Sequence, residues 1–158
     1  LLWGTGCAAA AATAVALGTG AARLAAARRW GRAGAIGYAA VAKRMIDSIR
    51  ASDGHPAGSI LVGDWAGPSD AHYTGTRPSD FMTDHFRRFG MADVVDHTYA
   101  TVAYLQDHVA VATGLLPDFA INATGAMPTP APGNWLEGGD DGNYSYNACI
   151  VPWPLATD

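Results

Sequence analysis

An arginine and an aspartate lie three positions apart in residues 75–90, GTRPSDFMTDHFRRFG, where a helix is expected to begin. Ser79 is a suitable N-cap, and Asp80 suits the positive end of a helix. Helix chemistry does not explain Arg77, because a cation is unfavourable just before a helix N-terminus. A guanidinium and a carboxylate held together could instead bind neighbouring hydroxyls of a sugar. The spacing alone leaves both interpretations open, and helix capping is the simpler one.

Two further stretches place carboxylates beside aromatic rings. In GDWAGPSD, Asp64 precedes Trp65, which could be a turn with a partly buried ring or a stacking platform with a hydroxyl acceptor. In NWLEGGDDGNYSYN, Glu137, Asp140 and Asp141 lie among glycines. Carboxylates on glycine loops are usually solvated. Glu137 follows Trp-Leu, however, so we expect it to be partly enclosed, which favours a general base.

Other kinds of site find little support in the sequence. The five histidines include no H-x-x-x-H pair, and there is no C-x-x-C, so neither a metal nor a cofactor is expected. Cys7 and Cys149 could form one bridge, although two buried thiols are the simpler expectation. The net charge is -4 and no basic stripe occurs, which argues against nucleic acid as a partner.

The pattern along the chain predicts helices joined by loops that carry the chemistry. Helices are expected over residues 8–29, 35–52, 79–89 and 91–110, with Gly90 ending the third. The apolar stripes of the second and fourth comprise Tyr38, Val41, Met45, Ile46 and Ile49, and then Val94, Val95, Tyr99, Val102, Leu105 and Val109. Residues 59–65 are expected to be extended, 114–147 to form a long loop, and 147–158 to begin as a helix. We therefore predict an all-α array of helical hairpins.

The alanine-rich stretch at residues 7–27 resembles a membrane span only superficially. Alanine is weakly apolar and Arg23 interrupts the run, so we interpret it as a soluble helix and expect no membrane partner. A signal peptide needs a basic start, and LLWGTG does not supply one.

Several segments together resemble glycoside hydrolase family 8, the bacterial endoglucanases, chitosanases and xylanases. They are RRWG, LVGDW, TRPSDFMTDHFRRF, GLLPDF, PAPGNWLEG and YSYNACIVPW, and they run from about Trp30 to the end. The resemblance implies an (α/α)6 barrel, only part of which is present, so that residues 1–158 are a partial catalytic domain. It also implies hydrolysis of internal β-1,4-glycosidic bonds with inversion, by a general acid and a general base.

The resemblance also implies roles for individual residues. The family's Arg-x-Ser-Asp motif matches Arg77, Ser79 and Asp80, which implies sugar contacts and places Asp80 in the catalytic set. Asn147 occupies the position of an aspartate base in one subgroup, which implies that the base comes from the preceding loop. Glu137 is then the first candidate base, with Asp140 or Asp141 second. The remaining substrate-binding candidates are Asp64, Trp65, Tyr146 and Asn147.

The chain departs from the family in the stretch ATAVALG. Ala14, Ala16 and Gly18 stand where the resemblance implies aspartates, and the general acid is expected before Leu1. We therefore expect an incomplete, inactive fragment. The alternative is a non-catalytic, carbohydrate-binding or degenerate remnant of such an enzyme.

The resemblance sets the expected partners and location. The parent enzyme is expected to be secreted, extracellular or periplasmic, with its signal peptide outside this chain. It is expected to be monomeric at full length. Its expected substrate is a polysaccharide, a β-glucan, with chitosan and xylan left open.

Overall fold

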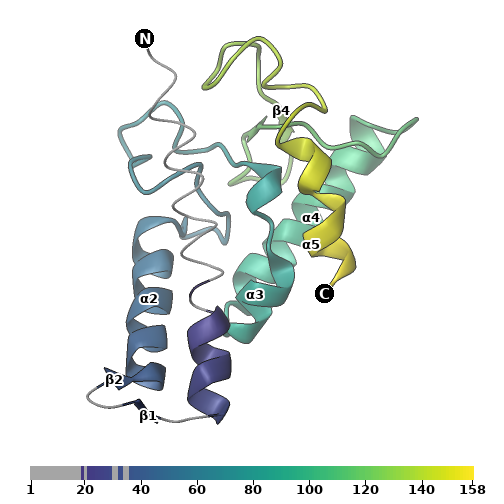
Figure 1. Ribbon diagram of the computed structural model, residues 1–158. Helices are drawn as coiled ribbons and strands as arrows, with labels where there is room; N and C mark the ends of the chain where they lie inside the picture. Colours follow the sequence, from purple (N-terminus) through teal and green to yellow (C-terminus); the bar gives the residue numbers. More distant parts are fainter. Residues whose placement is uncertain (1–18, 20, 30–31, 34–35) are drawn as a thin grey trace.

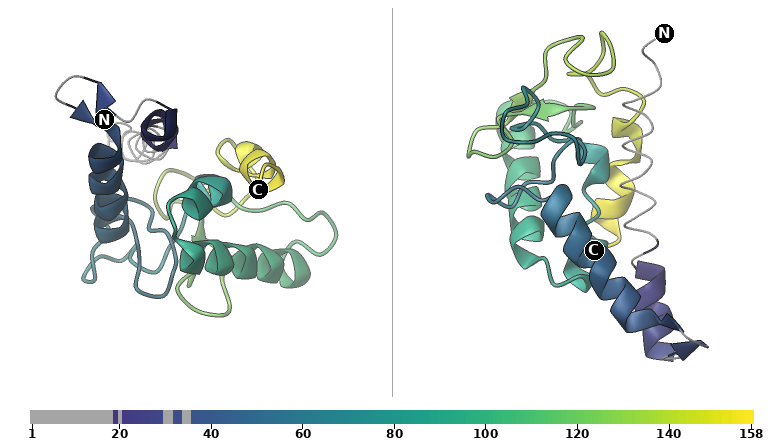
Figure 2. Two further views of the ribbon diagram at one scale, coloured as in Figure 1. Left: turned by 90° about the horizontal axis from the view of Figure 1, so that it is seen from below. Right: turned by 90° about the vertical axis from the view of Figure 1, so that its left-hand side faces the viewer.

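A computed structural model describes residue 19 and residues 21–29, 32–33 and 36–158 of the chain. Residues 21–29 are helical, which agrees with the prediction for 8–29 over the part described; Cys7, Ala14, Ala16 and Gly18 lie outside the described residues. The two-residue strands β1 (Arg32–Ala33) and β2 (Ile36–Gly37) pair antiparallel just before α2 (Tyr38–Ser52). Helix 21–29 and α2 lie side by side in Figures 1 and 2.

The second group of helices contains α3 (Thr83–Arg88), α4 (Ala92–His108) and α5 (Pro152–Ala156). Helix α3 packs against both α4 and α5, so residues near the C-terminus lie beside the middle of the chain (Figure 1). Gly90 has φ +73°, a left-handed conformation that ends α3 as predicted. The helix predicted from Ser79 is divided in two, because the 3-10 turn η1 (Pro78–Asp80) ends before α3 begins.

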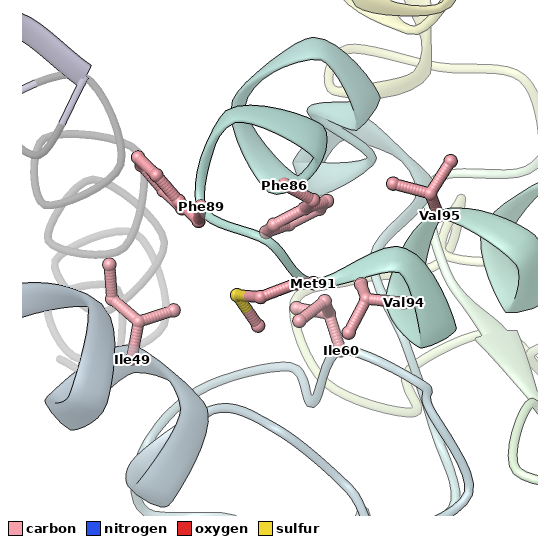
Figure 3. Close-up of a cluster of buried hydrophobic side chains, with 7 residues drawn as sticks. All are labelled: Ile49, Ile60, Phe86, Phe89, Met91, Val94 and Val95. Carbon is pink, nitrogen blue, oxygen red and sulfur yellow. The ribbon is translucent and has the colours of Figure 1, made fainter. Parts of the chain in front are cut away.

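One apolar cluster joins the helices to the extended segment. Figure 3 shows its buried side chains, which come from α2, residue 60, the α3 region and α4: Ile49, Ile60, Phe86, Phe89, Met91, Val94 and Val95. Arg50 at the end of α2 also donates two hydrogen bonds, of 2.8 and 2.9 Å, to Asp93 in the first turn of α4. Residues 59–65 are buried at Ile60, Leu61 and Val62 but form only an isolated bridge to Gly54. The prediction of a strand or extended segment is therefore met only by the bridge at Ile60, because the chain bends at Val62 and turns at residues 64–65.

The long segment after α4 is ordered around a second pair of strands. Strands β3 (Ala120–Ile121) and β4 (Thr129–Pro130) pair antiparallel, and Thr76 bridges to Ala120. A further apolar cluster packs this region against residues 61–66 through Leu61, Val62, Ala66, Phe119 and Ala131. The loop at 114–147 is therefore packed, through a core that it shares with residues 61–66.

The expected fold class is corrected by these observations. The described residues are not all-α: they contain two small antiparallel sheets, and the helices do not close an (α/α)6 barrel. The physical reason is that residues 53–77 and 109–147, rich in glycine and proline, run as packed coil where a helical-hairpin array would have short turns. The expectation of a buried thiol also fails at Cys149, which is free and exposed.

Candidate functional site

Arg77 lies at the centre of a buried polar cluster, where residues 76–80 meet the loop at 134–147. Its side chain is 3% exposed, and its Nη2 donates a 2.6 Å hydrogen bond to Oε1 of Glu137. The guanidinium carbon lies 4.5 Å from the centroid of the Phe119 ring, a cation-π contact. The position of Arg77 before the 3-10 turn is therefore explained by its contacts with Glu137 and Phe119, and not by the turn itself.

Asp80 lies beside Arg77 and is also buried. Its Oδ2 is 4.0 Å from Nε of Arg77, and the aspartate is 4% exposed. Burial raises the pKa of Asp80 to about 7, although Arg77 lowers it, and the charges of Asp53 and Glu137 raise it further. No side-chain capping bond is present at η1, so the prediction of Ser79 as an N-cap is wrong, whereas Asp80 does lie in the first turn, as expected.

Glu137 is the carboxylate of this cluster that solvent can reach. Its side chain is 23% exposed, which agrees with the predicted partial enclosure. Its Oε1 accepts from Arg77, and its Oε2 accepts a 3.1 Å hydrogen bond from Nδ2 of Asn147. Each carboxylate oxygen has a second lone pair, so the group can still accept a proton from a water molecule.

Asp141 holds the backbone that carries Glu137. Its carboxylate accepts hydrogen bonds from the backbone N–H groups of Leu136, Glu137 and Gly138, at 2.7, 3.1 and 2.8 Å. It is 3% exposed. Asp140 is exposed and accepts a hydrogen bond from the Asn143 side chain within a turn. Of the three candidate bases, Glu137 is therefore the one whose side chain belongs to the cluster. Asp141 contributes by holding the backbone that carries Glu137.

Asp118 holds the backbone that carries Asn147, as Asp141 holds the backbone that carries Glu137. Its carboxylate accepts from the backbone N–H groups of Ser145, Asn147 and Ala148, at 3.2, 3.3 and 2.7 Å. This role was not predicted from the sequence, although Asp118 follows a proline in GLLPDF, one of the segments that carry the resemblance. A buried aspartate facing several backbone donors has no distinctive sequence signal, because its partners lie 27 to 30 residues away.

A row of rings ends at Trp135, two residues before Glu137. The centroid of the His72 ring is 5.4 Å from that of Trp65 and 4.8 Å from that of Trp135. Trp65 is 39% exposed, which leaves ring surface available for stacking. Tyr146, next to Asn147, is 86% exposed. Tyr146 is thus the chain neighbour of a hydrogen-bond partner of Glu137, and Trp65 is linked through His72 to Trp135. No hydrogen bond, ion pair or ring contact joins the exposed Asp64 to the cluster in the described ranges.

Other kinds of site find no support in the described part of the chain. Within it, no group of three or more His, Cys, Asp or Glu side chains could hold a metal ion. Among the described helices, none is long and apolar enough to span a bilayer. A surface depression of about 300 Å³ lies elsewhere, between α4 and residues 124–128, and is lined mostly by small side chains.

The comparisons with known proteins point to glucan-hydrolysing enzymes. The chain is 37% identical over 139 residues to a β-glucanase of Niallia circulans, covering 83% of this chain and 34% of that protein. It is 32% identical over 140 residues to an endoglucanase of Bacillus sp. strain KSM-330, covering 83% of this chain and 29% of that protein. The apo structure of a β-1,3-1,4-glucanase from Paenibacillus sp. X4 superposes with a TM-score of 0.85 at 36% identity, over 92% of this chain and 40% of that one.

These findings correct the expected family. No family model matches the chain. The relatives are named by activity, as a β-glucanase, an endoglucanase and a β-1,3-1,4-glucanase, so that grouping replaces the expected assignment to glycoside hydrolase family 8. The inverting mechanism was implied by family 8 alone, so it is withdrawn together with that assignment. The chain spans about a third of the length of the curated relatives it matches, and it is a relative of glucanases.

Proposed function

We propose that this chain is part of a glycoside hydrolase that cleaves β-glucan, with Glu137 as its proton acceptor. The observation that carries the proposal is the arrangement around Glu137. A carboxylate 23% exposed is fixed by donors on both oxygens, with aromatic rings on the adjoining segments. A base that activates water needs this combination of access and fixed orientation.

The substrate we propose is a mixed-linkage β-1,3-1,4-glucan. The solved structure most relevant to this point is a β-1,3-1,4-glucanase that shares the fold of nearly the whole chain at 36% identity. Exposed rings at Trp65 and Tyr146 suit the flat faces of pyranose units. A strictly β-1,4-linked glucan is the second candidate, favoured by the relative named endoglucanase.

Arg77 and Asp80 take supporting roles in this proposal. Both are almost fully buried, so a sugar meets Glu137 and Asn147 before it meets either of them. Arg77 orients Glu137 by its 2.6 Å hydrogen bond, and Asp80 lies against Arg77, with its Oδ2 4.0 Å from Nε. The proposed sugar contacts are therefore Asn147, Trp65 and Tyr146.

The test uses a chimaera, because the chain spans about a third of its relatives. Residues 38–158 replace the corresponding segment of the N. circulans β-glucanase. We expect this chimaera to release reducing ends from barley mixed-linkage glucan faster than from carboxymethylcellulose, and the 158-residue chain alone to release none. A folded chimaera that cleaves only chitosan or xylan would contradict the proposed substrate class.

A further inference from the structure

His72 joins two loops that are far apart in the sequence. Its Nδ1 lies 2.7 Å from Oδ1 of Asp70, on its own loop, and its Nε2 lies 3.0 Å from the carbonyl oxygen of Trp135 on the other. The ring also packs edge-on against both Trp65 and Trp135. One partly buried side chain therefore contacts both rings of the aromatic row and the backbone two residues before Glu137.

The chemistry of the two contacts points to a clamp. Both ring nitrogens face oxygen atoms, and because a carbonyl oxygen can only accept, the contact at Nε2 is an N–H donated to Trp135. Asp70 completes it: hydrogen bonds from the backbone N–H and from the ring of His72 hold the pKa of Asp70 below its ordinary value. Asp70 is the charged partner on this side, and the opposite loop offers the uncharged ring and carbonyl of Trp135.

The far end of the Trp135 ring is fixed as well. A Cβ built on Gly75 would overlap that ring, lying 2.6 Å from its Cζ2 atom, so the ring lies directly against the backbone of residue 75. The next three backbone N–H groups are held by Asp141. Release of the Trp135 carbonyl would thus free one end of the segment whose other end carries Glu137.

We propose that His72 is a positioning residue, which clamps the Trp135 carbonyl so that the loop at 135–138 presents Glu137 to the substrate. The role in catalysis rests on the proposed function of Glu137. The clamp itself is a property of the fold and can be measured without any substrate.

The first test measures amide hydrogen exchange of residues 135–138 in the 158-residue chain. His72→Phe keeps an aromatic ring between the two tryptophans and removes both hydrogen bonds. We expect exchange at 135–138 to accelerate about five- to tenfold, as for a lost hydrogen bond. His72→Gln places an amide donor near the position of Nε2, so we expect it to restore most of the protection.

A matched control is His108→Phe on α4. His108 also stacks on a ring, that of Tyr104, and its Nδ1 also faces a carbonyl, but both contacts stay within one helix. It should leave exchange at 135–138 unchanged. Equal exchange in His72→Phe and the wild type would overturn the proposal, as would failure of His72→Gln to restore protection in a chain that remains folded.

The second test measures hydrolysis of mixed-linkage glucan by the chimaera. We expect His72→Phe to lower kcat about tenfold with little change in KM, and His72→Gln to recover most of kcat. Faster exchange without a change in kcat would overturn the catalytic part and leave the clamp intact. A chimaera inactive with His72 present would count against the proposed function alone.

Discussion

Asp80 shows how burial changes a single residue. Its motif, Arg-Pro-Ser-Asp, suggests either a helix cap or a sugar contact, and no side-chain capping bond is present at η1. The carboxyl is buried beside Arg77, and its pKa of about 7 results mainly from that burial. Sequence spacing revealed that Arg77 and Asp80 are partners, but it could not reveal Glu137 as a third member, because Glu137 lies 60 residues away.

The raised pKa of Asp80 predicts a pH-dependent stability. The folded state holds this proton up to about pH 7, whereas the unfolded chain loses it near the ordinary value of 3.8. The free energy of unfolding should therefore fall by a few kcal/mol as the pH rises from about 4 to about 7, and then level off.

Asp80→Asn tests this expectation, because the amide has the same shape and does not titrate in this range. Urea unfolding of the chain at pH 5 and pH 8 should show a much smaller difference in the variant than in the wild type. An equal difference in both would show that Asp80 is not the group responsible.

Asp141 and Asp140 are neighbouring carboxylates with different expected roles. Asp141→Asn replaces one of the two carboxylate oxygens, which together accept from three backbone N–H groups, by an NH2 group that cannot accept, so we expect a loss of about 1–3 kcal/mol in the free energy of unfolding. It should also lower kcat of the chimaera, because the backbone at Glu137 loosens. Asp140→Asn is the control, since Asp140 bonds only within its exposed turn. Denaturant unfolding that finds both variants equally stable would argue against this division.

At the scale of elements, the positions of the main helices and of the long loop could be predicted. The packing of that loop, including its two short strands, could not. Helices α2 and α4 carry apolar stripes with a helical period, and both appear within a few residues of their predicted bounds. The start of α3 was placed too early, because Pro78 and Ser79 are equally good in a 3-10 turn. Strands β3 and β4 have two residues each, too few for an alternating pattern to show.

Gly75 provides a test of how closely the loops pack. Gly75→Ala would push the Trp135 ring away from the backbone, so we expect a loss of about 1–3 kcal/mol in the free energy of unfolding and a shift in tryptophan fluorescence. Gly67→Ala is the matched control, because nothing lies within 4 Å of a Cβ at that position. If thermal melts show the two variants to be equally stable, the close contact between residue 75 and Trp135 is not present in solution.

At the scale of the whole molecule, the site is assembled from segments distant in sequence. Asp118 and Asp141 each fix a stretch of backbone, and those two stretches bring Asn147 and Glu137 to within 3.1 Å of each other. The described helices and their apolar clusters supply the frame, and Figure 2 shows the helices of the second group close together beside the coil. The sequence motifs indicated which segments carry chemistry; their meeting depends on packing over long separations, which no local pattern encodes.

The measurement that tests the account most directly compares Glu137→Gln with Asp140→Asn in the chimaera on mixed-linkage β-glucan. Glu137→Gln keeps the shape and removes the proton acceptor, so we expect kcat to fall by a factor of at least about 100, while Asp140→Asn stays near the unsubstituted rate. Circular dichroism would verify that both proteins fold. A folded Glu137→Gln chimaera that hydrolyses the glucan at the unsubstituted rate would contradict the assignment of Glu137 as the proton acceptor.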